Sequence, residues 1–558
     1  MKECNNVKQS PIAGLAAYGG GSGSVIFGRK GVDGYTIDRS LRFNSADSAY
    51  LGRTPSSASN RRTFTFSTWV KRHKLGTDQK LFGVNSAWFT FYFTSSDNLR
   101  VYYENSGSQY FTTNAVFRDP SAWYHIVLKV DTTQSTASDR VKIYVNSEEL
   151  TFSASGNTSQ NYEFGVNTTN AHDIGMRSSE SIMKADFNLA DVHFIDGQAL
   201  TPSSFGKSDA DTGVWNPKRF SGAFGTNGFH LKFADNSSNS ALGTDSSSNS
   251  NTWTVNNLSV AAGSGNDSLI DSPTNYEADS GNNGGNYATM NPVGQTKTQY
   301  FTENGNLVCG NSSVPSGSSG SRGFVPSTIG FKTGKWYCEC VTTKASDGDK
   351  DFAIGIFPAD STGYYSTSGH YAVRQEGTLF SPAGVNQSYG TSFGDGDVIG
   401  IAVDMDSSTK TIQWFKNGTA IASATTIADK EYFFGYGSDG GGGGRTYRAT
   451  WNFGQRPFAY TPPSNHLALC TQNLPEPTIA YGSTAMDVAL WTGTGATRSI
   501  TGLGFSPDFV WIKKRSGTTA HNLFDVVRGA SKPLFSNLTN AELSDGRLTA
   551  FNSDGFTL

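Results

Sequence analysis

The sequence predicts an all-β protein built from tandem antiparallel β-sandwiches, and three observations lead to that fold class. Charged residues make up only 16% of the chain, aromatic residues reach 13%, and glycines number 63. Short runs of aromatic and β-branched residues alternate with turns rich in Ser, Thr, Asn and Gly, the pattern of all-β domains. Helix signals are nearly absent. At 558 residues the chain is too long for one hydrophobic core, so several domains are expected.

Residues 1–34 are expected to form a leader that is flexible or docked on a partner. The segment contains the tract GGGSGS at 19–24, and such Gly/Ser composition behaves as a flexible chain. It has no sustained apolar run followed by a cleavage site, so we expect no export signal. No stretch of the sequence approaches the ~18 apolar residues that a membrane-spanning helix needs.

A first β-sandwich is expected over residues 35–202. Strand-like runs follow one another there: SLRFNS, TFTFSTWVKR, AWFTFYFTSS, NLRVYYE, AWYHIVLKVD, DRVKIYVN and ADFNLADVHFI. Two of these runs place apolar residues on one face, with a period of two. They are Ile126, Leu128 and Val130 in AWYHIVLKVD, and Val141, Ile143 and Val145 in DRVKIYVN. The spacer TTQSTASD would join the two runs as a long-looped hairpin.

An aromatic run, WFTFYF, places rings on both faces of one predicted strand. Phe89, Phe91 and Phe93 share a face that we expect to lie in the core. Trp88 and Tyr92 share the other face, which would pack against another domain or subunit, or stack on sugar rings. Packing is the favoured interpretation.

Three further regions follow along the chain. Residues 203–295 are rich in Asn, Ser, Gly and Asp, and only GFHLKFAD and TWTVNNLSV look ordered, so we expect a polar linker with appended strands. A second β-sandwich is expected over 296–474, ending in PFAYTPP. The last region, 475–558, has the pattern of strands and turns up to TAFNSDGFTL, and whether this module is complete stays open.

Two regions resemble known families. Over about 38–202, SLRFNSADSAYL, FTFSTWVKR, WYHIVLKVD, VKIYVN and FNLADVHFIDGQAL follow the order of the concanavalin A-like, laminin-G-type jelly roll. Over about 296–470, GKWYCECVTT, DFAIGIFPAD and GDVIGIAVDMDSSTKTIQWFKNG resemble strands of a SPRY (B30.2) domain. Both resemblances imply β-sandwiches that present loops to partners. The SPRY family has no characteristic enzyme activity.

The tail resembles a module repeated in tail-fibre-like proteins of marine bacteriophages, over FSPDFVWIKKRSGTTAHNLFDVVRGASKPLFSNLTNAE. Together with the two sandwiches, it implies a non-enzymatic virion structural protein, a tail fibre or receptor-binding component. Such a protein would be assembled in the host cytoplasm and attached to other virion proteins through residues 1–34. Its sandwich loops would contact a host surface glycan or protein. A homotrimer is expected by analogy with fibres, and a capsid decoration or head fibre is the alternative.

The hairpin sequence GIAVDMDSSTKTIQWFKNG contains two aspartates, Asp404 and Asp406, that raise the question of an acidic site. Counted from Asp404, the Gly and Glu that an EF-hand Ca²⁺ loop needs are replaced by Thr409 and Phe415. Apolar residues instead alternate up to a polar turn, and the closing Asn-Gly pair favours a two-residue turn. The sequence therefore predicts a structural hairpin. Four of its residues are expected to face the core: Ile401, Val403, Ile412 and Trp414.

A glycan depolymerase on the first sandwich is the enzymatic alternative, because jelly rolls also host retaining glycan hydrolases. Such an enzyme needs two carboxyl groups about 5 Å apart. The neighbouring Glu148 and Glu149 point to opposite faces of a strand, and Glu277 lies in the polar linker. We therefore expect no catalytic residues.

Calcium is the one ion left open, since laminin-G-like sandwiches often bind it at a rim. Asp131 ends one predicted strand, and Asp186 and Asp191 flank another, although each also fits an ordinary turn or strand edge. No ligands are assigned, and no other cofactor is expected. Cys338 and Cys340 share a strand face, so they are poorly placed for a disulfide. Without a second Cys pair or paired histidines, a zinc site is disfavoured.

Other function classes are disfavoured by counts and missing motifs. Lys and Arg total 44 against 47 acidic residues, and no basic stripe appears, so nucleic-acid binding has no electrostatic basis. The Gly-rich tracts at 19–24 and 438–445 lack the Lys-Ser/Thr of a phosphate loop, and the second is expected to be a rim loop. No H-x-x-x-H or H-E motif links the eight histidines, which include His73, His125, His172 and His193.

Overall fold

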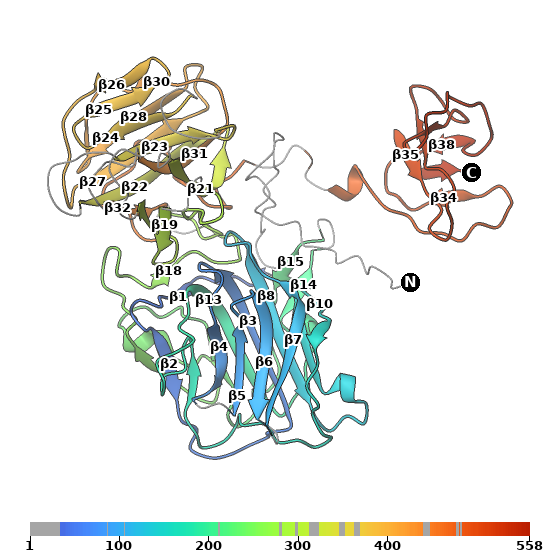
Figure 1. The fold of residues 1–558 in the computed structure, drawn as a ribbon, viewed down its shortest axis with the longest axis horizontal. Helices are drawn as coiled ribbons and strands as arrows, with labels where there is room; N and C mark the ends of the chain where they lie inside the picture. Colours follow the sequence, from blue (N-terminus) through green and yellow to red (C-terminus); the bar gives the residue numbers. More distant parts are fainter. Residues whose placement is uncertain are drawn as a thin grey trace. The chain divides into compact units, whose positions relative to one another are not determined.

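The fold is all-β and consists of tandem antiparallel sandwiches, as the sequence predicts (Figure 1). Among the described residues, the helical segments are single 3-10 turns, and none is long and apolar enough to cross a membrane. The chain separates into two compact units, Met1–Lys207 with Val214–Pro475, and Ser208–Gly213 with Glu476–Leu558. The computed structural model describes residues 34–85, 88–104, 107–209, 213–277, 282–295, 300–311, 323–344, 352–361, 369–438, 447–475, 479 and 482–558.

Two expectations fall almost wholly outside the described residues. They are the leader at 1–34, of which only Gly34 is described, and the Gly-rich loop at 438–445, of which only Ser438 is described. Both stay predictions.

The first sandwich consists of two eight-stranded sheets. One has the order β10 (Glu148–Glu149), β9 (Val141–Val145), β8 (Trp123–Asp131), β3 (Thr63–Arg72), β13 (Phe187–Asp196), β1 (Ser40–Phe43) and β18 (Ser268–Leu269), with β16 (Phe229–Leu231) beside β13. The other has the order β11 (Phe152–Ala154), β7 (Ser108–Val116), β6 (Asn98–Glu104), β5 (Phe89–Phe93), β4 (Gln79–Val84), β12 (His172–Ile174), β2 (Tyr50–Arg53) and β17 (Thr254–Asn256).

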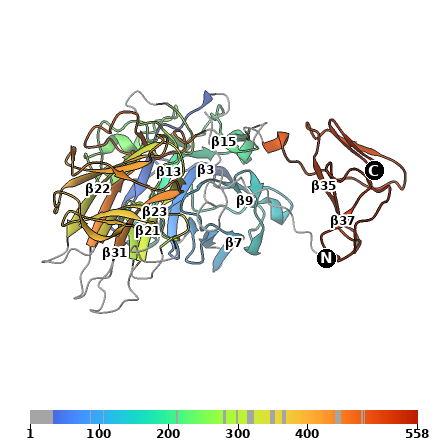
Figure 2. The same cartoon turned by 90° about the horizontal axis from the view of Figure 1, so that it is seen from above.

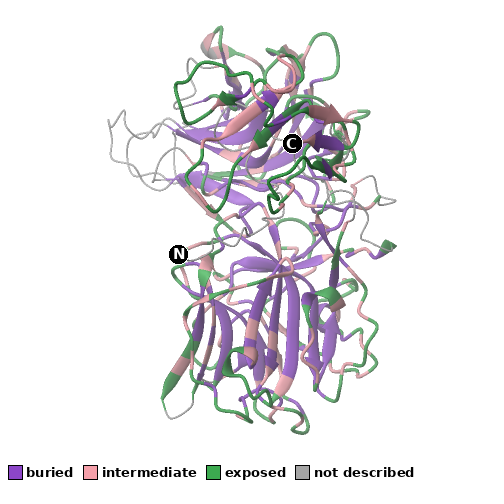
Figure 3. Cartoon of the chain, turned by 90° about the vertical axis from the view of Figure 1, so that its right-hand side faces the viewer, coloured by how far each residue is buried: buried purple, intermediate pink, exposed green. Residues whose placement is uncertain are grey.

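The core of the first sandwich lies between its two sheets, where the strands alternate as predicted. The apolar faces of β8 and β9 meet in register, with Leu128 opposite Ile143, and all six predicted positions are buried. From the other sheet, Phe89, Phe91 and Phe93 point into the same core. Buried strands with exposed turns are visible in both sandwiches (Figure 3).

The polar stretch 203–295 adds strands to the first sandwich. β16, β17 and β18 extend the two sheets, and β14 (Gly206–Ser208) pairs with β15 (Trp215–Pro217). Leu231, Leu242 and Trp253 from this stretch are buried in the core of the first sandwich. The stretch is therefore packed structure over much of its length, although its composition is that of a linker.

The second sandwich consists of a nine-stranded and a six-stranded sheet. The larger has the order β19 (Tyr300–Glu303), β20 (Val308–Asn311), β32 (Tyr447–Asn452), β22 (Lys335–Lys344), β27 (Val398–Asp404), β28 (Thr411–Lys416) and β29 (Thr419–Ala420), with β30 (Thr425–Thr426) beside β28 and β33 (Leu467–Ala468) beside β22. The smaller has the order β21 (Gly323–Phe331), β31 (Tyr432–Ser438), β23 (Phe352–Pro358), β24 (Tyr371–Arg374), β25 (Thr378–Ser381) and β26 (Gly384–Ser388).

A buried lysine joins β3 to the segment that leads into the second sandwich. The ammonium group of Lys71 lies 2.9 Å from a carboxylate oxygen of Asp271 and donates to Asn286 and to the carbonyl of Tyr287, both at 2.8 Å. Asn188 donates to the same carboxylate at 3.1 Å. Tyr287 also belongs to the core of the second sandwich. The two sandwiches are thus linked by a network of buried polar groups within one unit.

The second unit is small and has its own core. Its sheets have the orders β34 (Ser499–Thr501), β39 (Gly555–Thr557) and β38 (Ala550–Asn552), and β35 (Phe509–Ile512), β36 (Asn522–Asp525) and β37 (Leu534–Phe535) (Figures 1 and 2). Five buried side chains fill the core, namely Ile500, Val510, Phe524, Leu548 and Phe556.

Candidate functional site

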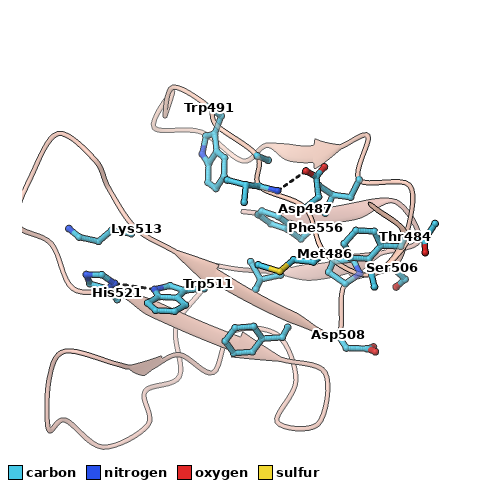
Figure 4. Close-up of a pocket in the computed structure, with 18 residues that line it drawn as sticks. Thr484, Met486, Asp487, Trp491, Ser506, Asp508, Trp511, Lys513, His521 and Phe556 are labelled. Atoms are coloured by element: carbon cyan, nitrogen blue, oxygen red, sulfur yellow. Dashed lines mark hydrogen bonds between the residues drawn. The ribbon is translucent and has the colours of Figure 1, made fainter. Parts of the chain in front are cut away.

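The second unit carries an open groove of about 940 Å³ lined mainly by apolar and aromatic side chains (Figure 4). Strand β35 forms one wall. Val510 points into the core, so its neighbours Phe509 and Trp511 lie on the outer face, where they are 54% and 59% exposed. This volume is within the range of small-molecule sites. Apolar side chains exposed side by side in this way are typical of an interaction surface.

The facing wall of the groove is the segment that precedes β34. Met486 and Val488 are 76% and 74% exposed and line the groove together with Asp487. At the end of this wall the indole of Trp491 packs edge-on against Phe556 of the core, with ring centroids 5.8 Å apart. The groove is therefore built on the hydrophobic core of its own unit.

Polar groups flank the aromatic wall and hold it in place. The indole N–H of Trp511 donates to Nδ1 of His521 at 3.1 Å (Figure 4). Lys513 donates to three backbone carbonyls at 2.8–3.0 Å, which closes the loop between β35 and β36. Flat apolar faces next to charged and hydrogen-bonding groups suit a ligand that is itself amphipathic, such as a sugar ring.

The two aspartates that raised the question of an acidic site serve the β27–β28 turn. Asp404 accepts hydrogen bonds from the backbone N–H groups of Asp406 and Ser407 at 3.0 and 2.9 Å, and pairs with Lys335 at 2.8 Å. Burial by itself would raise the pKa of Asp404, but the bonds from Lys335 and Ser407 hold it well below its usual value. Asp406 accepts from the N–H of Gly334 at 2.6 Å. The predicted structural hairpin is confirmed.

The rest of the hairpin also follows the prediction. Asn417 and Gly418 both have positive φ, +49° and +79°, as the two central residues of the tight turn require. The indole N–H of Trp414 donates to the carbonyl of Ile354 at 3.1 Å, which ties the hairpin to the opposite sheet. All four residues expected to face the core are fully buried: Ile401, Val403, Ile412 and Trp414.

The three aspartates considered for Ca²⁺ occupy different environments. Asp131 accepts hydrogen bonds from Thr133 and Gln134 in the turn after β8. Asp186 accepts the backbone N–H of Ser45 at 3.0 Å, and burial raises its pKa. Neither belongs to the cluster of possible metal ligands found among the described residues. That cluster contains the third aspartate, Asp191.

The cluster around Asp191 is buried on the outer face of the β3–β13 sheet. The Asp191 carboxylate accepts hydrogen bonds from Tyr35 at 2.7 Å and from His230 at 2.6 Å, and the ring of His193 stacks on His230 with centroids 3.9 Å apart. Burial lowers the pKa of His193 to about 3. Burial alone would raise the pKa of Asp191, but its imidazole and hydroxyl neighbours hold it below its usual range. The carboxylate is therefore ionised beside two imidazoles.

The remaining sequence candidates have structural roles. The carboxylate of Glu149 accepts from Tyr144 at 3.0 Å and pairs with Lys142 at 3.2 Å. Cys338 and Cys340 are buried free thiols on β22, and burial raises the pKa of each. Tyr92 lies on the outer sheet face, where Arg100 donates to its hydroxyl at 3.3 Å.

Sequence reasoning missed the groove and the buried cluster, of which it considered only Asp191, and that one for Ca²⁺. The sequence signal for the groove is FVWI, the run that forms β35. Every position of this strand is apolar, and a unit this small can cover only one face of the strand, so the other apolar face stays exposed. His230 carries no such signal. It lies 37 residues after His193, and only the pairing of β16 with β13 brings the two rings together.

Two stretches of the chain match family models. Residues 44–204 match a laminin-G-type model of the concanavalin A-like lectin/glucanases superfamily, and residues 482–558 match a domain of unknown function, DUF7483. The first match confirms the concanavalin A-like character predicted for the first sandwich. The second covers the unit that carries the groove.

Individual similar proteins are distant or partial. A dual specificity protein kinase, splA, of Dictyostelium discoideum is 33% identical over 114 residues, which are 19% of this chain and 4% of that protein. The SPRY domain of human HERC1 is 20% identical, with 29% of this chain and 96% of that chain covered and a TM-score of 0.24. A putative carbohydrate binding protein of Bacteroides ovatus is 16% identical, with 40% and 59% covered and a TM-score of 0.29. SPRY domains are thus among the structural neighbours of this chain.

Proposed function

We propose that the chain is a non-enzymatic bacteriophage virion protein, a tail fibre or receptor-binding component that binds a host surface glycan. The observation that carries the binding function is the groove of the second unit, with Phe509 and Trp511 exposed on its wall. The setting in a virion rests on the resemblance of the tail sequence to a module of marine phage fibres. Contacts through sandwich loops would add to the binding.

The groove favours a glycan over an extended peptide. Its rings are flat and more than half exposed, and its polar groups, Asp487, Lys513 and His521, are spread along it. Sugar rings present an apolar face of C–H groups and a rim of hydroxyls, which matches this alternation. A weak single site is sufficient, because several copies on one particle raise the overall avidity by orders of magnitude.

The test is the binding of surface polysaccharides from a panel of marine bacteria to the full chain. Trp511→Ala is expected to weaken binding to the recognised polysaccharide about tenfold or more, because it removes an aromatic anchor. Val527→Ala is the matched control, since Val527 is an apolar residue of the same unit, 92% exposed, outside the groove. Equal binding by Trp511→Ala and the wild type would exclude the groove as the receptor site.

The location on the particle is a separate question. Antibody or gold labelling of the chain in intact particles distinguishes a tail fibre from a capsid decoration or head fibre. A chain that is monomeric in solution and absent from particles would contradict the virion proposal altogether.

A glycan depolymerase remains the enzymatic alternative. Incubation of the recognised polysaccharide with the full chain, followed by a reducing-sugar assay, separates it from a binding protein. We expect no turnover. Clear release of reducing ends would overturn the non-enzymatic part of the proposal while leaving glycan recognition intact.

A further inference from the structure

Strand β13 contains a bulge at the point where it carries its acidic residue. Ala190 pairs with Trp69 and His193 pairs with Ser67, so two residues, Asp191 and Val192, lie opposite the single Thr68. Asp191 has a φ of +51°, in the left-handed region that an aspartate rarely adopts. The bulge therefore holds Asp191 in a fixed and unusual position beside the outward-facing His193.

The neighbouring strand supplies a second imidazole directly opposite. His193 and His230 are cross-strand partners, and Nε2 of His230 lies 2.6 Å from Oδ1 of Asp191. Nε2 of His193 lies 4.0 Å from the same oxygen. One donor atom of each residue lies within 4.8 Å of the other two, and all three residues are buried.

The ring of His193 has one nitrogen with a partner and one without. Nδ1 lies 3.1 Å from the backbone carbonyl of Asp191, an acceptor only, so Nδ1 carries the proton. Nε2 then holds a lone pair, and in this 1% exposed side chain it has no hydrogen-bond partner. A buried acceptor without a donor is unfavourable. A histidine that donates through one nitrogen to a carbonyl and directs the other, unprotonated, at a carboxylate has the arrangement of a metal ligand.

We propose that Asp191, His193 and His230 bind one divalent late first-row transition ion, for which Zn²⁺ is the probe. Two imidazoles and one carboxylate are the donor set that such ions prefer. Ca²⁺ does not suit the site, because it takes six to eight oxygen ligands. The ion would fill the gap in front of the His193 lone pair.

Binding requires the stacked rings of His193 and His230, whose centroids lie 3.9 Å apart, to rotate so that both lone pairs point at one ion. Zn²⁺ bonds to nitrogen and oxygen at roughly 2.0–2.2 Å, which sets tetrahedral donors about 3.4 Å apart. The 2.6 Å separation of His230 from Asp191 must therefore lengthen, and the 4.0 Å separation of His193 must shorten. The proton on Nε2 of His230 moves to Nδ1, so the ring stays neutral. Tyr35 keeps its hydrogen bond to Asp191 and orients the carboxylate.

The ion would act as a clamp between two strands. β16 is short, only Phe229–Leu231, and among the described strands it pairs only with β13. A metal shared by the cross-strand pair His193 and His230 would fasten β16 to the bulged part of β13. The site is buried, so its role is structural, and it is independent of the glycan groove.

The test is Zn²⁺ titration of the full chain, untagged and stripped with EDTA, by calorimetry and elemental analysis. We expect one tightly bound equivalent and a rise in Tm with free Zn²⁺. Co²⁺ should give visible absorption bands of a low-coordinate site. His230→Gln should weaken binding about tenfold or more while its amide still donates to Asp191, and His193→Gln should do the same.

His172→Gln is the matched control, because His172 is a buried histidine in the other sheet and is not part of the cluster. It should bind Zn²⁺ as the wild type does. Circular dichroism and the Tm without metal report whether each variant is folded. If His193→Gln does not fold, His230→Gln still tests the site. Absence of a bound equivalent in the wild type, or equal binding by a folded His230→Gln variant, would overturn the proposal.

Discussion

At the scale of single residues, Asp404 illustrates how a turn aspartate resembles a functional one in sequence. Its carboxylate satisfies the N–H groups of Asp406 and Ser407, accepts the Ser407 hydroxyl at 2.7 Å, and pairs with Lys335. The bonds from Asp406 and Ser407 close the bend between β27 and β28, and the pair with Lys335 ties that bend to β22. The spacing of two acids across one methionine therefore reflects the turn rather than a metal site.

Asp404→Ala is expected to destabilise the protein by about 1–3 kcal/mol, because several donors lose their acceptor at once. Asp406→Ala removes the single bond to Gly334 and should cost less. Urea denaturation of both variants checks the order. A variant at 404 that keeps wild-type stability but loses ligand binding would contradict the structural role.

A second residue-scale prediction concerns the acid stability of the fold. Burial lowers the pKa of His172 to about 4 from an ordinary value of 6.5. Between these values the unfolded chain binds a proton that the folded chain does not, so stability falls as the pH falls from about 6.5 to about 4. The loss from this residue is on the order of 3 kcal/mol.

His172→Gln removes this titration and should flatten the fall of stability across that pH window, measured by denaturation at several pH values. Above pH 7, the stability of the variant should differ from that of the wild type only by the packing lost on substitution, which does not depend on pH. Parallel curves for the wild type and the variant would mean that His172 does not titrate as argued.

At the scale of elements, the strands were predictable and their exceptions were not. The period-two alternation of β8, β9, β27 and β28 identifies which face is buried, because each strand has one apolar side. The bulge in β13 breaks that rule between Ala190 and His193, and the sequence FNLADVHFI carries no mark of it. The buried cluster depends on this bulge and on a distant strand, so alternation alone could not locate it.

The ion pair between β3 and the segment before the second sandwich gives a prediction at the same scale. Lys71→Met leaves the Asp271 carboxylate buried without its cation, which should cost about 3–5 kcal/mol. Adding Asp271→Asn removes the stranded charge and should restore part of the loss. Denaturation midpoints of the two variants decide this. A Lys71→Met variant as stable as the wild type would show that the ion pair contributes nothing to joining β3 to the segment before the second sandwich.

At the scale of the whole molecule, composition misrepresents the middle of the chain. Residues 203–295 have the composition of a linker, yet Leu242 and Trp253 lie in the first core and Ser268–Leu269 extends a sheet. Their hydrogen bonds are made largely by Asn, Ser and Asp side chains, as when Asp245 accepts the N–H groups of His230 and Ser247 at 2.8 Å. Low hydrophobicity therefore did not mean absence of packing here.

The two compact units lead to a calorimetric prediction. The second unit has a core separate from those of the two linked sandwiches, so we expect it to give its own, smaller thermal transition in the intact chain. Leu548→Ala, at a fully buried position of that core, should cost 2–5 kcal/mol by the usual range and lower only the smaller transition. A single transition that shifts as a whole would show that the units unfold together.

The hydrogen bond between Trp511 and His521 determines what the groove can distinguish. An indole has one polar atom, and His521 already occupies it. A ligand on this ring gains nothing from directed bonds to the tryptophan and is selected by the flatness of its own surface. In a saccharide, the ligand class proposed for the groove, an axial hydroxyl blocks stacking only through the face from which it projects, and the opposite face can still lie flat on the indole. Under the proposed function, such a surface would select saccharides by the stereochemistry of the face that they present more than by the identity of their substituents.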